Sequence, residues 1–247
     1  MAAMTLLQIV QEFCRRRGLP LPTTVTGAQD DSTLQVWGLA NEGISSMADR
    51  FEWQHLRTRY TFAHAGSTGY TALDLSESGT LPDYKAMLNR TLWDTLAKRE
   101  VYGPFDAKGW ETLLNLQVSQ AVYNYTIFGS ALRIYPVPSP IVADQFGMEY
   151  ISRYGVYDPI AAANTEFFTK DTSVCRLPAI LMLADLKWRW SAAKGLTYAE
   201  DFRMCEEMMV NLQGRDPAPD IRMDNFSMFD QVASPGLLVA AGSWNLP

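Results

Sequence analysis

Near both ends of the chain, apolar residues recur every three to four positions, the spacing that places them on one face of an α-helix. The predicted faces consist of Leu6, Ile9, Val10 and Phe13; of Leu34, Trp37, Ala40, Ile44, Met47 and Phe51; of Ile180, Leu181, Ala184 and Trp188; and of Tyr198, Phe202, Cys205, Met208, Met209 and Leu212. We therefore expect four helices. The first two are expected to pack as an antiparallel pair, and the early and late helices to form one bundle.

Capping signals predict where these helices begin and end. In a capping box, a hydroxyl and the side chain three residues later satisfy free backbone N–H groups at a helix start. Three pairs match this pattern: Thr5 with Gln8, Ser32 with Gln35, and Thr197 with Glu200. Glycines after the last apolar position predict helix ends, because glycine readily adopts the left-handed conformation found there. These glycines are Gly18, Gly195 and Gly214.

Between the helical segments the period changes to two, which is typical of β-strands. The alternating segments are residues 57–62, 70–73, 121–128, 131–135 and 146–154. The first two are expected to pair as a hairpin across a glycine-containing loop. The third and fourth flank Gly129-Ser130, which suits a type II′ turn because glycine can take the positive φ needed at the first turn position. The fifth is expected to add a third antiparallel strand.

These patterns predict an α+β fold: an antiparallel helical bundle made by N- and C-terminal helices, with an inserted antiparallel β-rich section and an extended C-terminal arm. The expected boundaries are residues 1–56 and 176–214 for the bundle, 57–175 for the insertion and 215–247 for the arm. The arm has no hydrophobic period and several prolines and glycines. It nevertheless carries large apolar residues, which favour burial against its own domain or a neighbouring subunit: Phe226, Met228, Phe229, Leu237, Leu238 and Trp244.

Composition points to a folded chain with much apolar surface to bury. Of the 247 residues, 47% are hydrophobic and 19% are charged. This balance hints at burial against partners, although a generous monomer core explains it almost as well. The net charge is −6, and lysine and arginine are dispersed, so we expect no tight binding of nucleic acid. An acidic surface suits a channel through which DNA slides, but ordinary solubility requires the same sign.

The familiar signatures of enzymes and cofactor sites are absent from the sequence. It contains neither GxxxxGK[ST], nor GxSxG, nor GxGxxG following a strand pattern. His55 and His64 do not have the spacing of metal ligands, and Cys14, Cys175 and Cys205 form no CxxC pair. We therefore expect no catalytic residue, cofactor or metal, and a reducing cytoplasm as the setting of folding. No apolar run approaches the ~20 residues of a membrane span, and no secretory signal is recognisable, so no membrane partner is expected.

Two groups of residues leave alternatives open. Glycoside hydrolysis needs a pair of carboxylates whose separation in space is not written in the sequence. Asp83, Asp94 and Asp106 are the first candidates for such a pair. The simpler interpretation is that all three aspartates lie in turns or on solvent-exposed faces.

An aromatic stretch is the second of these groups. Trp93, Tyr102 and Trp110 could line a carbohydrate or peptide groove. Packing in a core or against another subunit explains the same stretch more simply.

Several short motifs follow one another along the chain: Trp53-Gln54-His55-Leu56, Tyr60-Thr61-Phe62, Asn89-Arg90-Thr91-Leu92-Trp93-Asp94, Tyr102-Gly103-Pro104, Trp110, Gly129-Ser130, Leu132-Arg133-Ile134-Tyr135-Pro136, Glu149-Tyr150-Ile151-Ser152, Leu186-Lys187-Trp188-Arg189-Trp190, Lys194-Gly195-Leu196, Tyr198-Ala199-Glu200 and Phe202. This order of motifs resembles the head-to-tail adaptor, or tail tubular protein A-like, family of tailed bacteriophages. No single motif is diagnostic, and the long arm after Gly214 is a departure from the family.

This resemblance implies a structural virion protein rather than an enzyme. It implies a homo-oligomeric ring of about twelve copies at the head–tail junction, assembled in the host cytoplasm, through which double-stranded DNA passes without specific binding. The helices and arm would contact the portal protein, and the β-rich part the next tail or nozzle protein. We expect the apolar arm residues, together with Trp93, Tyr102 and Trp110, to lie at partner interfaces. Another tail or baseplate ring component is the alternative within the same class. A virion-associated hydrolase that uses a carboxylate pair is the alternative of another class.

Overall fold

The computed structural model describes residues 3–66, 70–88, 90–115 and 122–216. The helices are α1 (Leu6–Arg17), α2 (Asp31–Arg50), the short 3-10 helix η1 (Gln54–Leu56), α3 (Ala107–Asn115), α4 (Ala179–Ala193) and α5 (Ala199–Arg215). The strands are β1 (Arg57–Phe62), β2 (Thr71–Asp74), β3 (Tyr84–Met87), β4 (Trp93–Asp94), β5 (Arg99–Glu100), β6 (Asn124–Phe128), β7 (Ala131–Tyr135), β8 (Phe146–Ser152), β9 (Val156–Asp158), β10 (Ala163–Thr165) and β11 (Val174–Cys175). Helices and antiparallel sheets together confirm the mixed α+β class.

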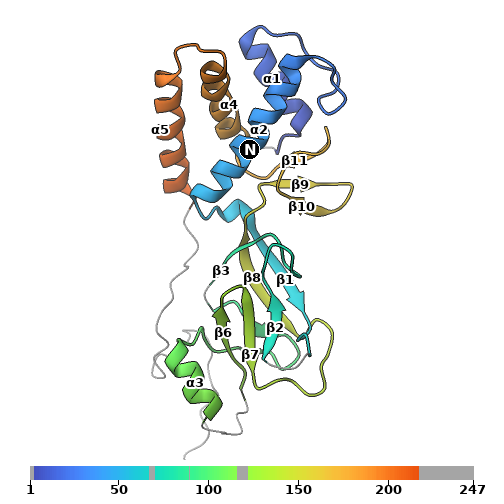
Figure 1. Ribbon diagram of the computed structural model, residues 1–247, viewed down its shortest axis with the longest axis vertical. Helices are drawn as coiled ribbons and strands as arrows, with labels where there is room; N and C mark the ends of the chain where they lie inside the picture. The colour runs from blue at the N-terminus through green and yellow to red at the C-terminus, as the bar shows by residue number, and fades with distance from the viewer. Residues whose placement is uncertain (1–2, 67–69, 89, 116–121, 217–247) are drawn as a thin grey trace, which may run out of the picture.

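The elements are arranged in two parts along the long axis of the molecule. Helices α1, α2, α4 and α5 gather at one end, and β1 to β8 with α3 extend toward the other (Figure 1). The small sheet of β9, β10 and β11 lies beside the helices. Val174 of β11 forms an isolated bridge with Thr5, and the Leu6 N–H donates to the Ser173 carbonyl at 2.8 Å. The stretch from β9 to β11 thus packs with the N-terminal helix rather than with the other strands.

Local signals determine the ends of α1. Thr5 and Gln8 form the expected capping box, in which each side chain accepts from the backbone N–H of the other residue. Gly18 follows the last turn with a φ of +66°, the left-handed conformation that favours glycine. Both predicted boundaries of this helix are confirmed.

The other two capping boxes do not form. Helix α2 begins earlier than expected because Asp30 is its cap, accepting from the Thr33 N–H at 2.9 Å. Ser32 lies inside the helix and donates its hydroxyl to Asp30. Helix α5 begins at Ala199 with no side-chain cap, and it continues one residue past Gly214. An adjacent carboxylate replaces the hydroxyl in the first case, because it satisfies the same free N–H groups.

Helix α4 is the centre of the helical part. Helices α1, α2 and α5 all pack mainly against α4, and α1 contacts α2 much less than expected for a pair. Residues on several sides of α4 are therefore buried, including Leu181, Leu186 and Trp190. Helices α1 and α2 contact each other, but α4 supplies the larger apolar surface, and each helix buries its own face mainly there.

A buried polar group lies where α2 approaches α4. Asp185 of α4 accepts from Arg189 Nε at 2.7 Å and from Trp188 Nε1 at 3.0 Å. Burial raises the pKa of Asp185, and the charge of Arg189 partly opposes that rise. Gly43 of α2 faces this carboxylate so closely that a Cβ at this position would overlap Asp185 Oδ2. Glycine at position 43 therefore allows the two helices to pack around a paired charge.

We expect Gly43→Ala to lower the free energy of unfolding by about 1–3 kcal/mol, the usual cost of forcing extra volume into a packed site. Gly38→Ala, in the same helix, is the matched control, because a Cβ there meets nothing within 4 Å. The control should raise the free energy of unfolding by about 0.5–1 kcal/mol through helix propensity. Urea unfolding of both variants measures the difference, and equal effects would contradict the proposed close approach.

Strand β8 organises the larger sheet. It pairs along one edge with β1, from Phe62 opposite Phe146 to Arg57 opposite Ile151. Along its other edge it pairs with β3 and β4, and β5 completes the sheet. A separate three-stranded sheet has the order β2-β7-β6. The alternation of β8 places its side chains on two covered faces, so most of its residues are buried.

The sequence predicted where the strands lie more accurately than which strands pair with one another. The β6–β7 hairpin is confirmed, with a φ of +59° at Gly129. Strands β1 and β2, however, do not form the expected hairpin, since they belong to different sheets. The expected pairing of β8 with that β6–β7 hairpin is also wrong, because β2 is the third strand there. Alternation determines which face of a strand is buried, but it does not specify the neighbouring strand.

The two parts of the molecule share hydrogen bonds and apolar contacts. Lys85 of β3 donates to the carbonyls of Ala48, Asp49 and Phe51, at 2.9, 2.9 and 3.1 Å, at the end of α2. A cation is favourable there because the helix dipole leaves partial negative charge on the last carbonyls. Leu88, which follows β3, belongs to the same core as the helices. These contacts link the larger sheet to the helical part.

Candidate functional site

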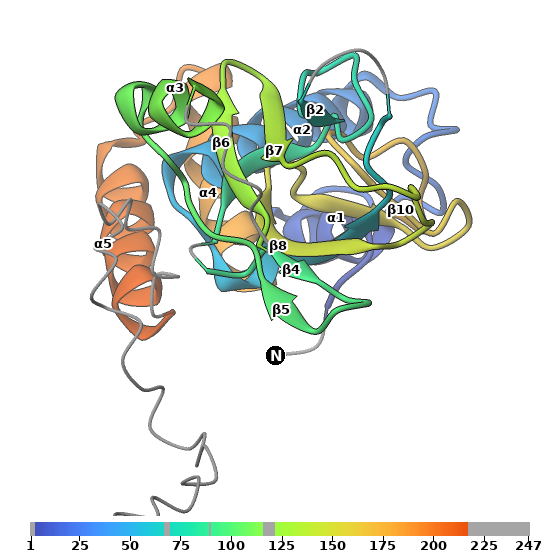
Figure 2. The same ribbon diagram turned by 90° about the horizontal axis from the view of Figure 1, so that it is seen from below.

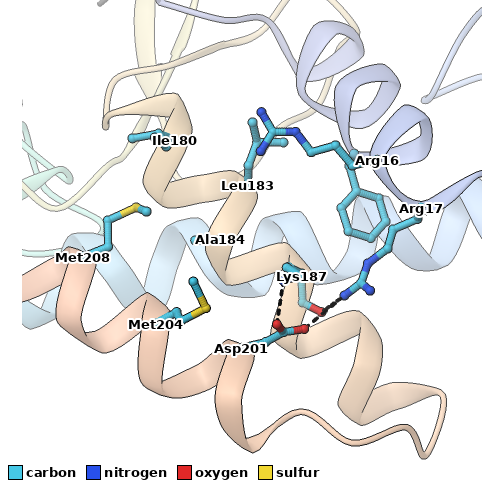
Figure 3. A pocket seen from close by; sticks show the side chains of 10 residues that line it. Arg16, Arg17, Ile180, Leu183, Ala184, Lys187, Asp201, Met204 and Met208 are labelled. Carbon is cyan, nitrogen blue, oxygen red and sulfur yellow. Dashed lines mark hydrogen bonds and ion pairs between the residues drawn. The ribbon is translucent and has the colours of Figure 1, made fainter.

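An apolar hollow of the helical part lies between the C-terminal end of α1, α4 and α5. Its volume is about 320 Å³, near the lower end of the range for ligand pockets. Ten residues line it: Phe13, Arg16, Arg17, Ile180, Leu183, Ala184, Lys187, Asp201, Met204 and Met208 (Figure 3). We refer to this feature as the helical groove. Its apolar walls remain accessible, since Ile180 is 40% and Met204 51% exposed.

The helical groove is positively charged at one end. Asp201 of α5 pairs with Lys187 at 2.6 Å and with Arg17 at 3.3 Å. Arg17 also donates to the Lys187 carbonyl and to Ser191 Oγ, each at 2.9 Å. Arg16 is exposed and pairs with Glu12 on its own helix. Three basic residues and one acidic residue line the groove, so the lining carries a positive charge excess of two.

Helix α5 leaves a second apolar surface exposed beside this groove. Of the six positions predicted for its buried face, only Cys205 and Met209 are buried. Phe202 is 40% exposed although it packs edge-on against Trp188, with ring centroids 5.1 Å apart. Val210 is 65% exposed. The helix therefore contacts its own domain through a narrow stripe and presents large apolar side chains outward.

Apolar side chains are also exposed in the β part. Leu96, in the β4–β5 turn, is 56% exposed, and Ile141, in the β7–β8 loop, is 45% exposed. The two segments are joined by Thr95, which donates through its backbone N–H to the Gln145 carbonyl and through its hydroxyl to the Asp144 carbonyl, both at 2.8 Å. This end of the molecule, remote from the helices, is seen face-on in Figure 2.

Another hollow, of about 420 Å³, lies between α3 and the β6–β7 hairpin. Phe128 at its edge is 65% exposed, and the Arg133 guanidinium lies 4.6 Å above the Phe128 ring. The Trp110 side chain forms part of its wall. Helix α3 was not predicted from the sequence, although Trp110 and Leu113, three positions apart, form its buried face.

The structure does not gather the predicted aromatic residues into one cluster. Trp93 on β4 is 45% exposed, and its indole N–H donates to the Arg90 carbonyl at 3.3 Å. Tyr102 precedes α3 and exchanges backbone hydrogen bonds with the start of β6. Trp110 is buried, with its ring edge-on to Tyr70. Of the three, only Trp93 presents a large exposed surface.

The predicted arm residues lie outside the described part of the chain. These are Phe226, Met228, Phe229, Leu237, Leu238 and Trp244.

The three candidate carboxylates have separate structural partners. Asp83 is buried and accepts from the Tyr150 hydroxyl at 2.9 Å and from Ser152 Oγ at 2.8 Å. Burial, together with the neighbouring charge of Asp83, raises the pKa of Tyr150. Asp94 accepts from two backbone N–H groups of the β4–β5 turn, each at 2.9 Å. Asp106 accepts from the Gly109 N–H at 2.7 Å at the start of α3. The hydrogen bonds found for these three residues include no shared partner.

The histidines and cysteines have no ligand-like arrangement in the described residues. No group of three or more His, Cys, Asp or Glu side chains there is placed to hold a metal ion. Cys14, Cys175 and Cys205 are buried and unpaired. His64 lies in the loop after β1 and is buried, and its Nδ1 accepts from the Gly66 N–H at 3.1 Å. Within the described ranges, no helix is both long and apolar enough to span a bilayer.

Comparisons with known proteins identify no family for this chain. No protein-family model matches this chain, and no curated protein matches it significantly.

The helical groove was not anticipated from the sequence. Met204 lies outside the face predicted for α5, whereas Met208, four positions later, belongs to that face. The two side chains line the groove together, beside the buried stripe of Cys205 and Met209. On α4, Ile180 and Ala184 repeat this spacing. Such a double stripe is the available sequence signal for a helix that contacts two surfaces.

Burial lowers the pKa of His64 below its usual value near 6.5. In the interval between the folded and unfolded pKa values, the unfolded state binds more protons, so stability falls as the pH decreases through that interval. We expect the free energy of unfolding to drop more between about pH 7.5 and pH 5.5 in the wild type than in His64→Gln. Parallel curves for the wild type and His64→Gln in urea titrations would refute this assignment.

Proposed function

We propose that this protein is a structural component of a tailed-bacteriophage virion, a head-to-tail adaptor. In this role, about twelve copies form a ring beneath the portal protein and join it to the next tail or nozzle protein. Double-stranded DNA passes through the ring without specific binding. The order of sequence motifs that resembles the adaptor family supports this role, and the protein performs no chemistry in it.

The observation that carries the proposal is the exposure of large apolar side chains on two remote parts of one subunit. The helical part exposes the walls of the helical groove and the outer side of α5, including Val210. The β part exposes Leu96 and Ile141 near its far end. Exposed apolar patches on soluble proteins mark interaction surfaces. Two such surfaces suit a subunit that joins different partners above and below it and contacts copies of itself at the sides.

We further infer a division of the chain that fits this role. Residues 1–56 and 176–214 would form one helical bundle, residues 57–175 an inserted β-rich section, and residues 215–247 an arm. The packing of α1 and α2 on α4 supports this division, because it joins helices from the two ends of the chain. The arm is acidic and apolar in sequence, and it would contact the portal or neighbouring subunits.

The charge of the chain supports passage of DNA without capture. The net charge is −6, and two of the three basic residues of the helical groove, Arg17 and Lys187, form ion pairs with Asp201. A ring with a negative overall charge would repel the phosphate backbone at long range. Affinity for DNA in the absence of portal should therefore be weak at physiological salt.

Removal of the arm tests this proposal. A chain ending at Asp216 retains α5 and the hydrogen bond from the Gln54 N–H to the Asp216 carboxylate. We expect this variant to unfold in urea like the full chain, since the described core is intact, but to lose docking on purified portal rings. Negative-stain images of portal with each protein measure docking, and annular density is expected only with the full chain.

A matched variant separates loss of arm contacts from loss of chain length. In it, Phe226, Phe229 and Trp244 are replaced by serine within a full-length chain. Docking should be lost here as well, because the apolar side chains make the contact. Normal docking by both variants would contradict the role of the arm. Absence of any annular particle with the full chain and portal would contradict the adaptor proposal itself, and density elsewhere in a virion would favour another tail or baseplate ring component.

A further inference from the structure

We propose that, in the isolated subunit, the helical groove is covered by the C-terminal segment of the same chain, residues 217–247. The inference depends on the groove, on the place where α5 ends and on the composition of that segment. It does not depend on the adaptor role, because any folded copy of this chain contains all three.

The apolar content of the segment matches that of the groove. The groove walls include Ile180 of α4 and Met204 of α5, which are 40% and 51% exposed. Half-exposed walls of this kind gain stability when a further apolar side chain removes them from water. The first part of the segment supplies such side chains at short intervals: Ile221, Met223, Phe226, Met228 and Phe229.

The charges of groove and segment are opposite in sign. The groove lining has Arg16, Arg17 and Lys187 against Asp201, a net charge of +2. Residues 217–247 contain three aspartates, at positions 220, 224 and 230, against one arginine at position 222, a net charge of −2. Asp224 lies between Met223 and Phe226, and Asp220 and Asp230 flank the group of apolar residues on either side. An extended chain can therefore place apolar side chains in the groove and carboxylates near its basic end.

The point at which the described chain ends allows this contact. Asp216 is held beside η1, where its carboxylate accepts from the Gln54 N–H at 3.0 Å. Met204 lies 12 residues before Asp216 on a continuous helix, which corresponds to about 18 Å along the helix axis. A chain that turns back along α5 covers that distance in roughly six extended residues. Ile221 to Phe229 are thus within reach of the groove.

Intramolecular reach favours the chain's own segment over that of another copy. A tethered segment has an effective concentration near the millimolar range when its linker is short. A segment from a second copy must compete at the actual protein concentration, which is far lower in a dilute solution. The free subunit should therefore satisfy its own groove, whatever partners it meets on assembly.

Thiol labelling provides the test. Met204→Cys places a reactive thiol in the groove, and Val210→Cys places one on the same helix outside it, at a site that is 65% exposed. The three native cysteines are buried and give a low background. Each substitution is made in the full chain and in the chain ending at Asp216, and the rate of reaction with iodoacetamide is measured for the four proteins.

We expect the thiol at position 204 to react about tenfold more slowly in the full chain than in the shortened chain, as for a covered state populated roughly ten times as often as the open one. The thiol at position 210 should react equally fast in both. Arg16→Glu in the full chain should move the rate at position 204 toward that of the shortened chain. Arg16 is more than half exposed, and a circular dichroism spectrum of this variant checks that the helices are retained.

The reaction rate at several protein concentrations distinguishes the chain's own segment from the segment of another copy. Protection by the chain's own segment is independent of protein concentration, whereas protection by another copy weakens as the protein is diluted. Equal rates at position 204 in full and shortened chains, at any concentration, would overturn the proposal. Protection that disappears on dilution would also overturn it, and would assign the groove to the segment of a second copy.

Discussion

The burial of α4 between three other helices is the constraint on which the helical part of this protein depends. Helices α1 and α2 precede the sheets and α5 follows α4, yet all three bury their apolar faces on α4. Packing on α4 therefore brings together helices from both ends of the described chain, with the strands of the sheets between them in sequence. Because several sides of α4 are covered, even a carboxylate on it must be paired: Asp185 is held by Arg189 and faces the bare backbone at Gly43.

This arrangement explains why the groove exists. Helix α5 packs on α4 through a narrow stripe that includes Cys205 and Met209, and α1 reaches α4 from another side. Helices α1 and α5 both pack on α4, and a hollow remains where the surfaces of the three helices diverge. The side chains at that point are apolar, with basic residues from α1 and α4 at one end. A surface that exposes apolar walls beside unbalanced positive charge is suited to an acidic, apolar segment.

The larger sheet follows the same principle around β8. Strands β1, β3 and β4 all pair with it, so its backbone groups are satisfied on both edges. Lys85 of β3 then reaches the last carbonyls of α2, which ties the sheet to the helices. The exposed side chains of the β4–β5 turn and the β7–β8 loop lie at the other end of this sheet. The exposed apolar surfaces thus lie on different parts of the molecule, one on the helices and one at the far end of the larger sheet.

The sequence by itself determined features that depend on neighbouring residues. The helix α1 with its capping box at Thr5, the turn at Gly129 and the mixed α+β class all follow from local hydrogen bonding, from the φ that glycine allows, and from hydrophobic period. Tertiary structure alone decided the strand partners, the packing of three helices on α4, and the exposure of Met204. Local patterns specify which face of an element is apolar. Which surface covers that face depends on contacts between residues far apart in the chain, and these contacts leave no periodic signal.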